Sequence, residues 1–423
     1  MSDAAPASGV VDGLFRRSAG RLVSMLAGRL GADRLDLAEE AVQDALLRAL
    51  ELWPHRGVPA DPEAWLHTVA RNRALDLLRR ETRSATLLAA ADRELAAPAE
   101  PTTAARDEVR LLLLAAHPSL TPRARVVLAL KLVAGFGTRE IARALFADEA
   151  AVAQMLVRAK RTIRSSGIAL APPTPADLEQ RLASALDTVY LMFNEGHSAS
   201  EGELAIREDV CVAAIRLGEL LAADPDTARP EVFALLALMS FHASRLAARI
   251  GPAGELLTLE RQDRSRWDRA RIDAGLRYLD QAAVGSRVTH WHLEAGIASL
   301  HAVAKRSDEV DWRTILQLYD RLLELRPSPI ARLNRAVALA RVEGPEAALE
   351  EVRVVAGHPA LANYYLLAAV EAELQSALGD SAAARDALAR ARAGARTAPE
   401  RALLDARIAE LGSQAEREPP SRE

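Results

Sequence analysis

Apolar residues recur at helical spacing along most of the chain, and clusters of Gly, Pro and polar residues separate the helical stretches. The clearest stretch is 61–83, in which five apolar residues share one face of a helix: Trp65, Leu66, Val69, Leu75 and Leu78. Asp61 stands at the N-cap position, and Pro62 stands in the first turn, where a missing N–H removes no hydrogen bond. The pattern predicts a helix that packs on one side.

Two further helices are expected before this one. Leu14–Leu30 and Asp36–Leu52 both have helical periodicity, and acidic residues occupy the first turns of the second, as the helix dipole favours. A loop containing Pro and Gly at 53–60 precedes Asp61. We expect these helices to form one small domain, residues 11–83.

The next segment, 84–106, is rich in alanine, contains prolines and is predicted to be a linker. Helical periodicity returns from Asp107. A break at AGFG (134–137), a short helix capped by Thr138 and a longer helix ending near Arg164 together form a helix-turn-helix pattern. We therefore expect a second small domain at 107–167, which the prolines at 172–175 separate from the rest.

Residues 176–411 are again helical, with charges of both signs. GPEAALEEV at Gly344 aligns with GDSAAARDAL at Gly379, and each follows an apolar helix (Arg332–Val342 and Ala362–Leu378). Two helices joined by a Gly turn are typical of tetratricopeptide-type repeats. The predicted fold class is all-α, with two small helical domains followed by a larger tetratricopeptide-like helical domain.

Composition agrees with this class, since hydrophobic residues make up 50% of the chain but aromatic residues only 4%. The net charge of −4 argues against nucleic-acid binding over the whole surface, so any such binding must be local. The single cysteine, Cys211, excludes an intramolecular disulfide and a cysteine-based zinc site. The chain has no signal-peptide pattern and no uncharged apolar window of about 18 residues, so we expect a cytoplasmic protein without a membrane span.

Positive charge is concentrated in two places. The 61–83 helix sets five arginines (Arg71, Arg73, Arg79, Arg80 and Arg83) against only Asp76 and Glu81, which suits a polyanion. The last helix of the helix-turn-helix presents a basic face whose outward residues would be Ala151, Gln154, Met155, Arg158, Lys160, Arg161 and Arg164. A helix of this diameter fits the major groove of DNA. The alternative is an ordinary helical hairpin with a solvated basic face.

In this order and spacing, the two modules resemble an RNA polymerase sigma factor of the extracytoplasmic-function (ECF) subfamily. DLAEEAVQDALLRALELWP resembles sigma region 2.2, AWLHTVARNRALDLLRRETR resembles regions 2.3 and 2.4, and residues 120–164 resemble the region 4 helix-turn-helix. Three later segments resemble the subset of this subfamily that carries a fused C-terminal tetratricopeptide-like domain: LMFNEGHSAS, LERQDRSRWDRARI and SPIARLNRAVALA. Phe146 and Ala151 depart from the pattern of the family near the turn.

The resemblance implies promoter recognition and melting of the −10 element, with no catalysis and no cofactor. The implied partners are promoter DNA and core RNA polymerase, through the β′ clamp helices and the β flap. Contacts with the −10 element would come from Asn72, Arg73, Asp76, Arg79, Arg80 and Arg83, and the loop at 54–60 would capture a flipped base. Contacts with the −35 element would come from Arg139, Ala151, Gln154, Met155, Arg158, Lys160, Arg161 and Arg164. Contacts with polymerase would come from Glu39, Gln43, Asp44 and Arg48.

The C-terminal domain is expected to regulate activity or to bind a regulatory protein or ligand. Its candidate pocket residues are Asn194, Glu195, His197, Asp263, Arg264 and Trp267, which could equally form a hydrogen-bonded network that fixes domain packing. His290 and His292 would lie on different faces of a helix, so no metal site is expected. Two other functions stay open: a helix-turn-helix regulator that acts without polymerase, and an enzyme in which Glu195, His197 and Asp263 converge.

Overall fold

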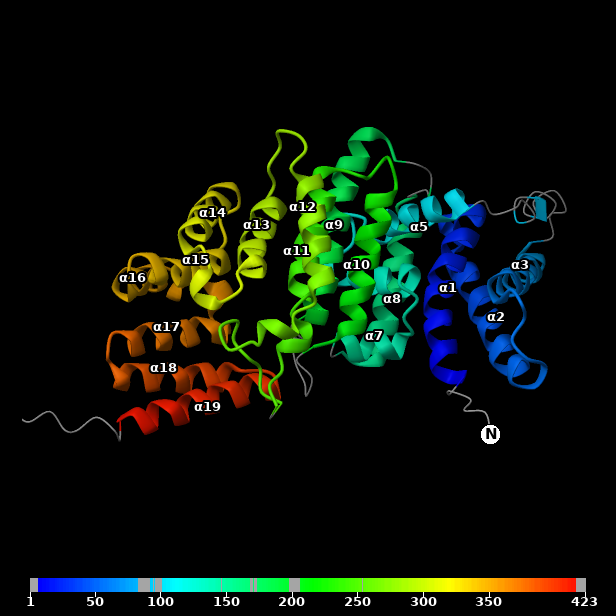
Figure 1. Cartoon of the computed structure of the whole chain (residues 1–423). Helices are drawn as coiled ribbons and strands as arrows, with labels where there is room; N and C mark the ends of the chain where they lie inside the picture. Colours follow the sequence, from blue (N-terminus) through cyan, green and yellow to red (C-terminus); the bar gives the residue numbers. More distant parts are fainter. Residues whose placement is uncertain are drawn as a thin grey trace, which may run out of the picture. The chain divides into compact units, whose positions relative to one another are not determined.

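The computed structural model describes residues 7–82, 92, 93, 95, 101–145, 147–167, 170, 173–197, 206–252 and 254–415. Within these residues the predicted all-α fold is confirmed (Figure 1). The β-pairing in this part of the chain is limited to an isolated bridge between Ile250 and Leu256. Two compact units divide the chain. The first unit contains Met1–Phe193 and Val212–Ala228, and the second contains Asn194–Cys211 and Arg229–Glu423.

The first unit begins with three α-helices: α1 (Ala7–Leu30), α2 (Leu35–Arg56) and α3 (Pro62–Glu81). The predicted N-cap of α3 is confirmed, since the Asp61 carboxylate accepts a hydrogen bond from the Ala64 N–H at 2.9 Å. On its apolar face Leu66, Leu75 and Leu78 are buried. Trp65 is half-buried and packs edge-on against Trp53 of α2, with 5.6 Å between the ring centroids. The apolar side of α3 therefore packs on α2, as its periodicity predicts.

The helix-turn-helix follows α5 (Pro101–Ala115), which begins inside the segment expected to be linker. Its elements are α6 (Pro122–Leu128), a π-helical turn η2 (Ala129–Val133), α7 (Thr138–Ala144) and α8 (Glu149–Ser165). Thr138 is the first residue of α7 rather than its cap, because the Glu140 carboxylate accepts from the Gly137 N–H at 2.8 Å and closes this end. The predicted packing face is confirmed, and its residues are all buried: Ile141, Ala142, Leu145, Val152 and Leu156.

Helices α1 and η2 approach each other closely at a glycine. A Cβ atom placed on Gly20 would lie 1.9 Å from the Val133 carbonyl oxygen, so any other residue at position 20 would force the two elements apart. The first three helices and the helix-turn-helix therefore share a packed contact in this structure.

Two helices beyond the expected boundary at 176 also belong to the first unit for most of their length. These are α9 (Pro175–His197) and α10 (Glu208–Ala223). The hydroxyl of Ser184 donates to the Ala116 carbonyl, and the Arg216 guanidinium pairs with the buried Glu108 carboxylate on α5. The compact units consequently divide at different places from the predicted domains.

The second unit is built from consecutive helices: α11 (Pro230–Ala243), α12 (Arg269–Ala282), α13 (His290–Val303), α14 (Trp312–Leu325), α15 (Pro329–Val342), α16 (Pro345–Ala356), α17 (Tyr365–Ala377), α18 (Ser381–Gly394) and α19 (Ala398–Ala415). From α13 to α19 each helix packs on the next in chain order (yellow to red in Figure 1). The predicted helical hairpins are confirmed, with Gly344 (φ 104°) and Gly379 (φ 83°) in their turns.

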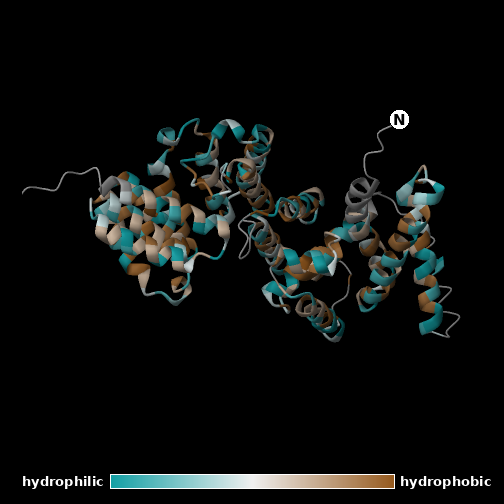
Figure 2. Cartoon of the chain, turned by 90° about the horizontal axis from the view of Figure 1, so that it is seen from below, coloured by the Kyte–Doolittle hydropathy of each residue, from teal (hydrophilic) through white to brown (hydrophobic). Residues whose placement is uncertain are grey.

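Apolar and polar positions alternate around these helices as their packing requires (Figure 2). One segment, Pro230–Ala248, is long and apolar enough to cross a membrane by composition, but 72% of it is buried inside the structure. Burial of this kind is typical of a helix in the interior of a helical domain.

Candidate nucleic-acid interface

One face of α8 is an open surface. Ala151, Gln154, Arg158 and Arg161 are exposed, Met155 is half-buried, and Arg139 on α7 is also exposed. The Asp148 carboxylate caps α8 by accepting from the Ala151 N–H at 3.2 Å. The opposite face of α8 is buried, so the exposed residues are held on a rigid helix. This arrangement suits insertion of the helix into a DNA groove.

Two cations near the C-terminal end of α8 pair with carboxylates of α2. Lys160 Nζ lies 2.9 Å from Asp36 Oδ1 and also donates to the Glu39 carboxylate, while Arg164 pairs with Asp36. Lys131 of η2 lies 3.1 Å from Glu39. We call these five residues the α2–α8 network. It unites residues predicted separately to contact DNA (Lys160, Arg164) and polymerase (Glu39).

Two groups of the α2–α8 network, Lys160 and Asp36, are held in their charged forms. Burial, the largest single effect, lowers the pKa of Lys160, but the carboxylates of Glu39 and Asp36 together raise it above its usual value. Burial likewise raises the pKa of Asp36, while Lys160 and Arg164 together bring it below its usual value. A hollow of about 400 Å³ adjoins Asp36, Lys160 and Arg164. The contact is therefore polar and incompletely packed.

The polar face of α3 has both open and occupied positions. Asn72, Asp76, Arg79 and Arg80 are exposed, and Asp76 accepts a hydrogen bond from Arg79 Nη1 at 2.9 Å. Arg83 lies outside the described residues.

Two arginines of α3 are held by carboxylates. Arg73 is half-buried, donates to Asp44 of α2 and lies 3.4 Å from Glu40, and Arg71 lies 3.3 Å from Asp92. Arg73 and Asp44, predicted to contact DNA and polymerase, are thus paired with each other. Arg71 and Arg73 are therefore paired with carboxylates, whereas Arg79 and Arg80 are the exposed arginines of α3.

The other predicted polymerase residues lie along the same helix, α2. The Gln43 amide donates to Glu39 at 3.3 Å, and Arg48 is exposed. The expected loop at 53–60 is shorter than predicted, because α2 continues through Pro54 to Arg56 and ends at Gly57, whose φ is 81°. Capture of a base would therefore have to use residues 57–61 and the start of α3.

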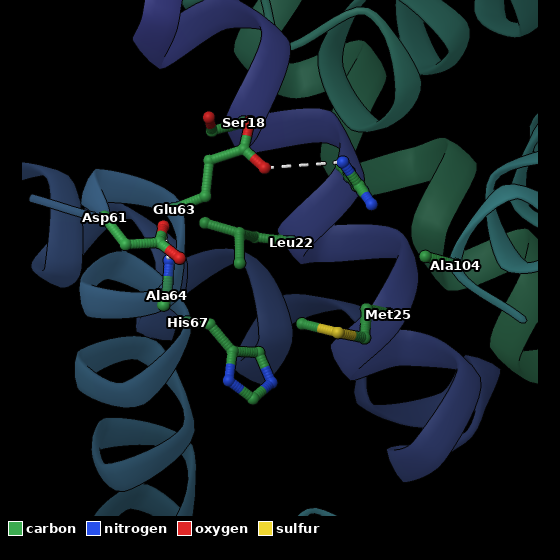
Figure 3. Close-up of a pocket in the computed structure, with 9 residues that line it drawn as sticks. Ser18, Leu22, Met25, Asp61, Glu63, Ala64, His67 and Ala104 are labelled. Carbon is green, nitrogen blue, oxygen red and sulfur yellow. Dashed lines mark hydrogen bonds and ion pairs between the residues drawn. The ribbon is translucent and has the colours of Figure 1, made fainter. Parts of the chain in front are cut away.

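A cavity of about 230 Å³ lies beside the start of α3, among residues of α1, α3 and α5 (Figure 3). Glu63 reaches across it to the Arg21 guanidinium at 3.4 Å. His67 Nε2 and Ser18 Oγ are buried and have no hydrogen-bond partner among the described residues. Burial, followed by the positive charges of Arg29 and Arg71, lowers the pKa of His67, so its ring is neutral. The sequence offers no signal for this cavity, since its walls come from three separate helices.

The predicted C-terminal pocket residues have different surroundings. The His197 ring contacts the His242 ring at 5.2 Å, and its Nε2 is buried. Asp263 is exposed and accepts from the Ser265 N–H at 2.9 Å. His197 and Asp263, two of the three residues of the enzyme alternative, thus have different partners in this structure.

Arg264 and Trp267 do lie together, with the guanidinium 4.4 Å from the ring centroid. Asn194 and Glu195 lie in the last turns of α9 and are partly buried. Among the contacts described, the structure joins Arg264 with Trp267.

The remaining candidate metal ligands also have separate partners. His292 Nδ1 contacts the Thr289 hydroxyl at 2.8 Å, and His290 Nε2 contacts Arg326 at 3.1 Å. In the described part of the chain no group of three or more His, Cys, Asp or Glu residues is arranged to hold a metal ion.

Three segments of the chain match known families. Residues 14–84 match Sigma-70 region 2, residues 110–163 match Sigma-70 region 4, and residues 181–283 match a family of unknown function, DUF6596. An uncharacterized protein of Rhizobium meliloti (strain 1021) is 40% identical over 388 residues, which cover 90% of this chain and 91% of that protein. No solved structure matches this chain.

Proposed function

We propose that this chain, which belongs to the sigma-70 family as an ECF-like sigma factor with an extra C-terminal domain, directs promoter recognition and melts the −10 element. Its family domains support a non-enzymatic role in transcription initiation, with core RNA polymerase and promoter DNA as partners. The contacting residues, the cytoplasmic location and the regulatory role of the C-terminal domain are parts of the proposal.

The observation that carries the proposal is the exposure of polar and basic groups on both matched segments. Within the region 4 match, α8 exposes Gln154, Arg158 and Arg161 from a firmly packed helix. Within the region 2 match, α3 exposes Asn72, Arg79 and Arg80. Arginines supply phosphate attraction, and side-chain amides supply hydrogen bonds to base edges.

The α2–α8 network adds a step to this function. Lys160 is only 13% exposed and paired with Asp36 and Glu39, and Glu39 is only 12% exposed beneath two lysines, whereas Arg164 pairs with Asp36 and remains 53% exposed. We therefore propose that the network opens before the chain engages polymerase and promoter. Competing phosphates and polymerase cations would replace the internal partners, so the exchange conserves charge pairing.

The direct test is run-off transcription on fragmented genomic DNA with purified bacterial core RNA polymerase and the full-length chain. Transcripts should begin downstream of two shared sequence elements. The double variants Arg158→Gln/Arg161→Gln and Arg79→Gln/Arg80→Gln should each lose most of these transcripts. Arg353→Gln, which alters an exposed arginine paired with Glu350 on α16, is the matched control.

Failure of the full-length chain to stimulate transcription on any fragment would refute the proposal. Sequence-specific binding to duplex DNA that persists unchanged in the Arg79→Gln/Arg80→Gln variant, without such stimulation, would favour the helix-turn-helix regulator.

A further inference from the structure

The second unit contains a cavity of about 330 Å³ that none of the proposed sigma contacts uses. Its walls come from the loop at 258–264 and from α13, α14, α15, α17 and α19. Because these elements are far apart in the sequence, the cavity exists only when the helical stack has folded. Its volume lies at the lower end of the range of about 300–1,000 Å³ for small-molecule sites.

One wall of the cavity is aromatic. The rings of His301 and Trp312 meet edge to face, with 5.2 Å between their centroids. The Arg341 guanidinium lies 5.7 Å from the centroid of the Trp312 ring. Tyr319 and Ile315, one turn apart on α14, also line the cavity. Flat π surfaces of this kind favour a planar ligand.

The ionised groups that line the cavity carry more positive than negative charge. Three arginines face it (Arg264, Arg341 and Arg407) and two glutamates (Glu260 and Glu373). Arg341 pairs with Glu260 and lies 3.6 Å from Glu373, which also lies 3.7 Å from Arg407. Arg264 differs, since it donates to the carbonyls of His301 at 2.7 Å and Ala304 at 2.8 Å. Its Nε has no partner among the described residues.

A further cation reinforces this imbalance from beside the cavity. Burial, followed by repulsion from Arg249 and Arg264, lowers the pKa of Arg245 to about 9, which still leaves it charged at neutral pH. Burial, followed by the charges of Arg245 and Arg264, lowers the pKa of His301 to about 4, so the histidine is neutral there. His301 Nδ1 is buried without a hydrogen-bond partner in the described chain. An anion in the cavity would offset the uncompensated guanidinium charge.

We propose that this cavity binds a small organic carboxylate with a planar body, the carboxylate on Arg341 and Arg264 and the planar body against Trp312 and His301. A carboxylate matches the forked donor geometry of a guanidinium. Binding of this ligand goes beyond the sigma-factor role and does not depend on it, since the site lies wholly within the second unit.

The test is isothermal titration calorimetry on the full-length chain, without polymerase or DNA. The probes are benzoate and 2-naphthoate, each compared with its neutral amide, benzamide or 2-naphthamide. At least one carboxylate should bind about tenfold more tightly than its amide, because each charge-assisted hydrogen bond to a guanidinium exceeds its neutral counterpart. Arg341→Gln should weaken carboxylate binding about tenfold, whereas Arg353→Gln should leave it unchanged.

A second variant distinguishes a specific effect on binding from misfolding. Glu260 competes with the ligand for Arg341, so Glu260→Gln should tighten carboxylate binding severalfold, a gain that a damaged fold would not produce. Circular dichroism on each variant checks that the helical fold is intact. The proposal is overturned if neither carboxylate binds at about 1 mM, the millimolar limit of weak specific binding. It is also overturned if acid and amide bind equally, or if Glu260→Gln weakens binding.

Discussion

Asp36 holds both Lys160 and Arg164 of α8, so neutralising this one carboxylate should weaken the contact between α2 and the proposed DNA-reading helix. The change Asp36→Asn keeps the size of the side chain and leaves every residue proposed to contact DNA or polymerase unaltered. We call the form with the α2–α8 network intact the closed form. Glu39 still holds Lys160 and Lys131 in the variant, so the closed form is destabilised but not abolished.

The expected magnitude follows from the exposure of the pairs. The side chains of Asp36 and Arg164 are 55% and 53% exposed, so solvent screens this pair strongly. Lys160 is only 13% exposed, which places its pair with Asp36 near the upper end of the range for surface pairs. Losing both pairs should shift the closed-to-open equilibrium by about 1 kcal/mol, or about fivefold. If the closed form dominates, apparent affinity for a −35 duplex rises by the same factor.

Fluorescence anisotropy with a labelled duplex carrying the −35 element found by run-off transcription measures this affinity. Asp33→Asn is the control, because Asp33 is 67% exposed, lies near α2 and has only Arg34 as an ion-pair partner at 4.0 Å among the described residues. It removes the same charge but breaks no ion pair with α8 among the described residues. Equal affinities for Asp36→Asn and Asp33→Asn would refute the role of the network.

The network should also be insensitive to pH near neutrality. A lowered pKa for Asp36 means that its contribution is complete above its ordinary value of 3.8 and is lost only at more acidic pH. The raised pKa of Lys160 means that its contribution is complete below 10.5 and is lost only at more alkaline pH. The affinity ratio of Asp36→Asn to wild type should therefore stay constant from about pH 6 to about pH 8.

The remaining predictions concern DNA contact and the stability of the second unit. Arg161→Gln should reduce the slope of log K against log salt by about 0.9 in duplex-binding titrations, and an unchanged slope would exclude a phosphate contact. Gly379→Ala, at φ 83° in an open turn, should lower the free energy of unfolding by about 1–2 kcal/mol. Gly357→Ala, at φ −84° and equally open, should cost little in the same denaturant titration, and equal costs would contradict the backbone argument. Burial, followed by the charges of nearby arginines, holds the pKa of His242 well below 6.5. Below pH 6.5 the unfolded chain therefore binds a proton that the folded chain does not, and the free energy of unfolding decreases as the pH is lowered. This histidine contributes at most about 1.4 kcal/mol per pH unit. His242→Gln should therefore flatten the dependence of melting temperature on pH, and an unchanged dependence would exclude His242 as its source.

Local features of the sequence predicted the local structure well. Asp61 and Pro62 fix the start of α3 through a cap and a turn that involve only neighbouring residues. The periodicity of 138–164 likewise identified the buried face of the helix-turn-helix, because burial on a helix follows its own repeat.

The missed features all depend on partners far away in the chain. Helical spacing placed Lys160 on a polar face but could not show that Asp36, 124 residues away, lies opposite it. The same limit applies to Arg73. Its positive charge suggested a contact with DNA, but in the folded chain it is paired with Asp44 of α2. The cavity beside Trp312 draws on residues from 258 to 407, and no single stretch of sequence has a pattern that predicts it.

The course of the chain between the compact units limits where this protein can be truncated. The chain passes from one unit to the other at 193/194, 211/212 and 228/229, and α9 and α10 supply part of the first unit. Removing everything after residue 167 would take Ser184 from the Ala116 carbonyl and Arg216 from Glu108 of α5, leaving this buried carboxylate without its cation. The segment that follows region 4 is thus partly built into the first unit. A sigma factor shortened at the end of its region 4 would lack part of its own interior, so gain and loss of this extension are expected to involve compensating changes in α5.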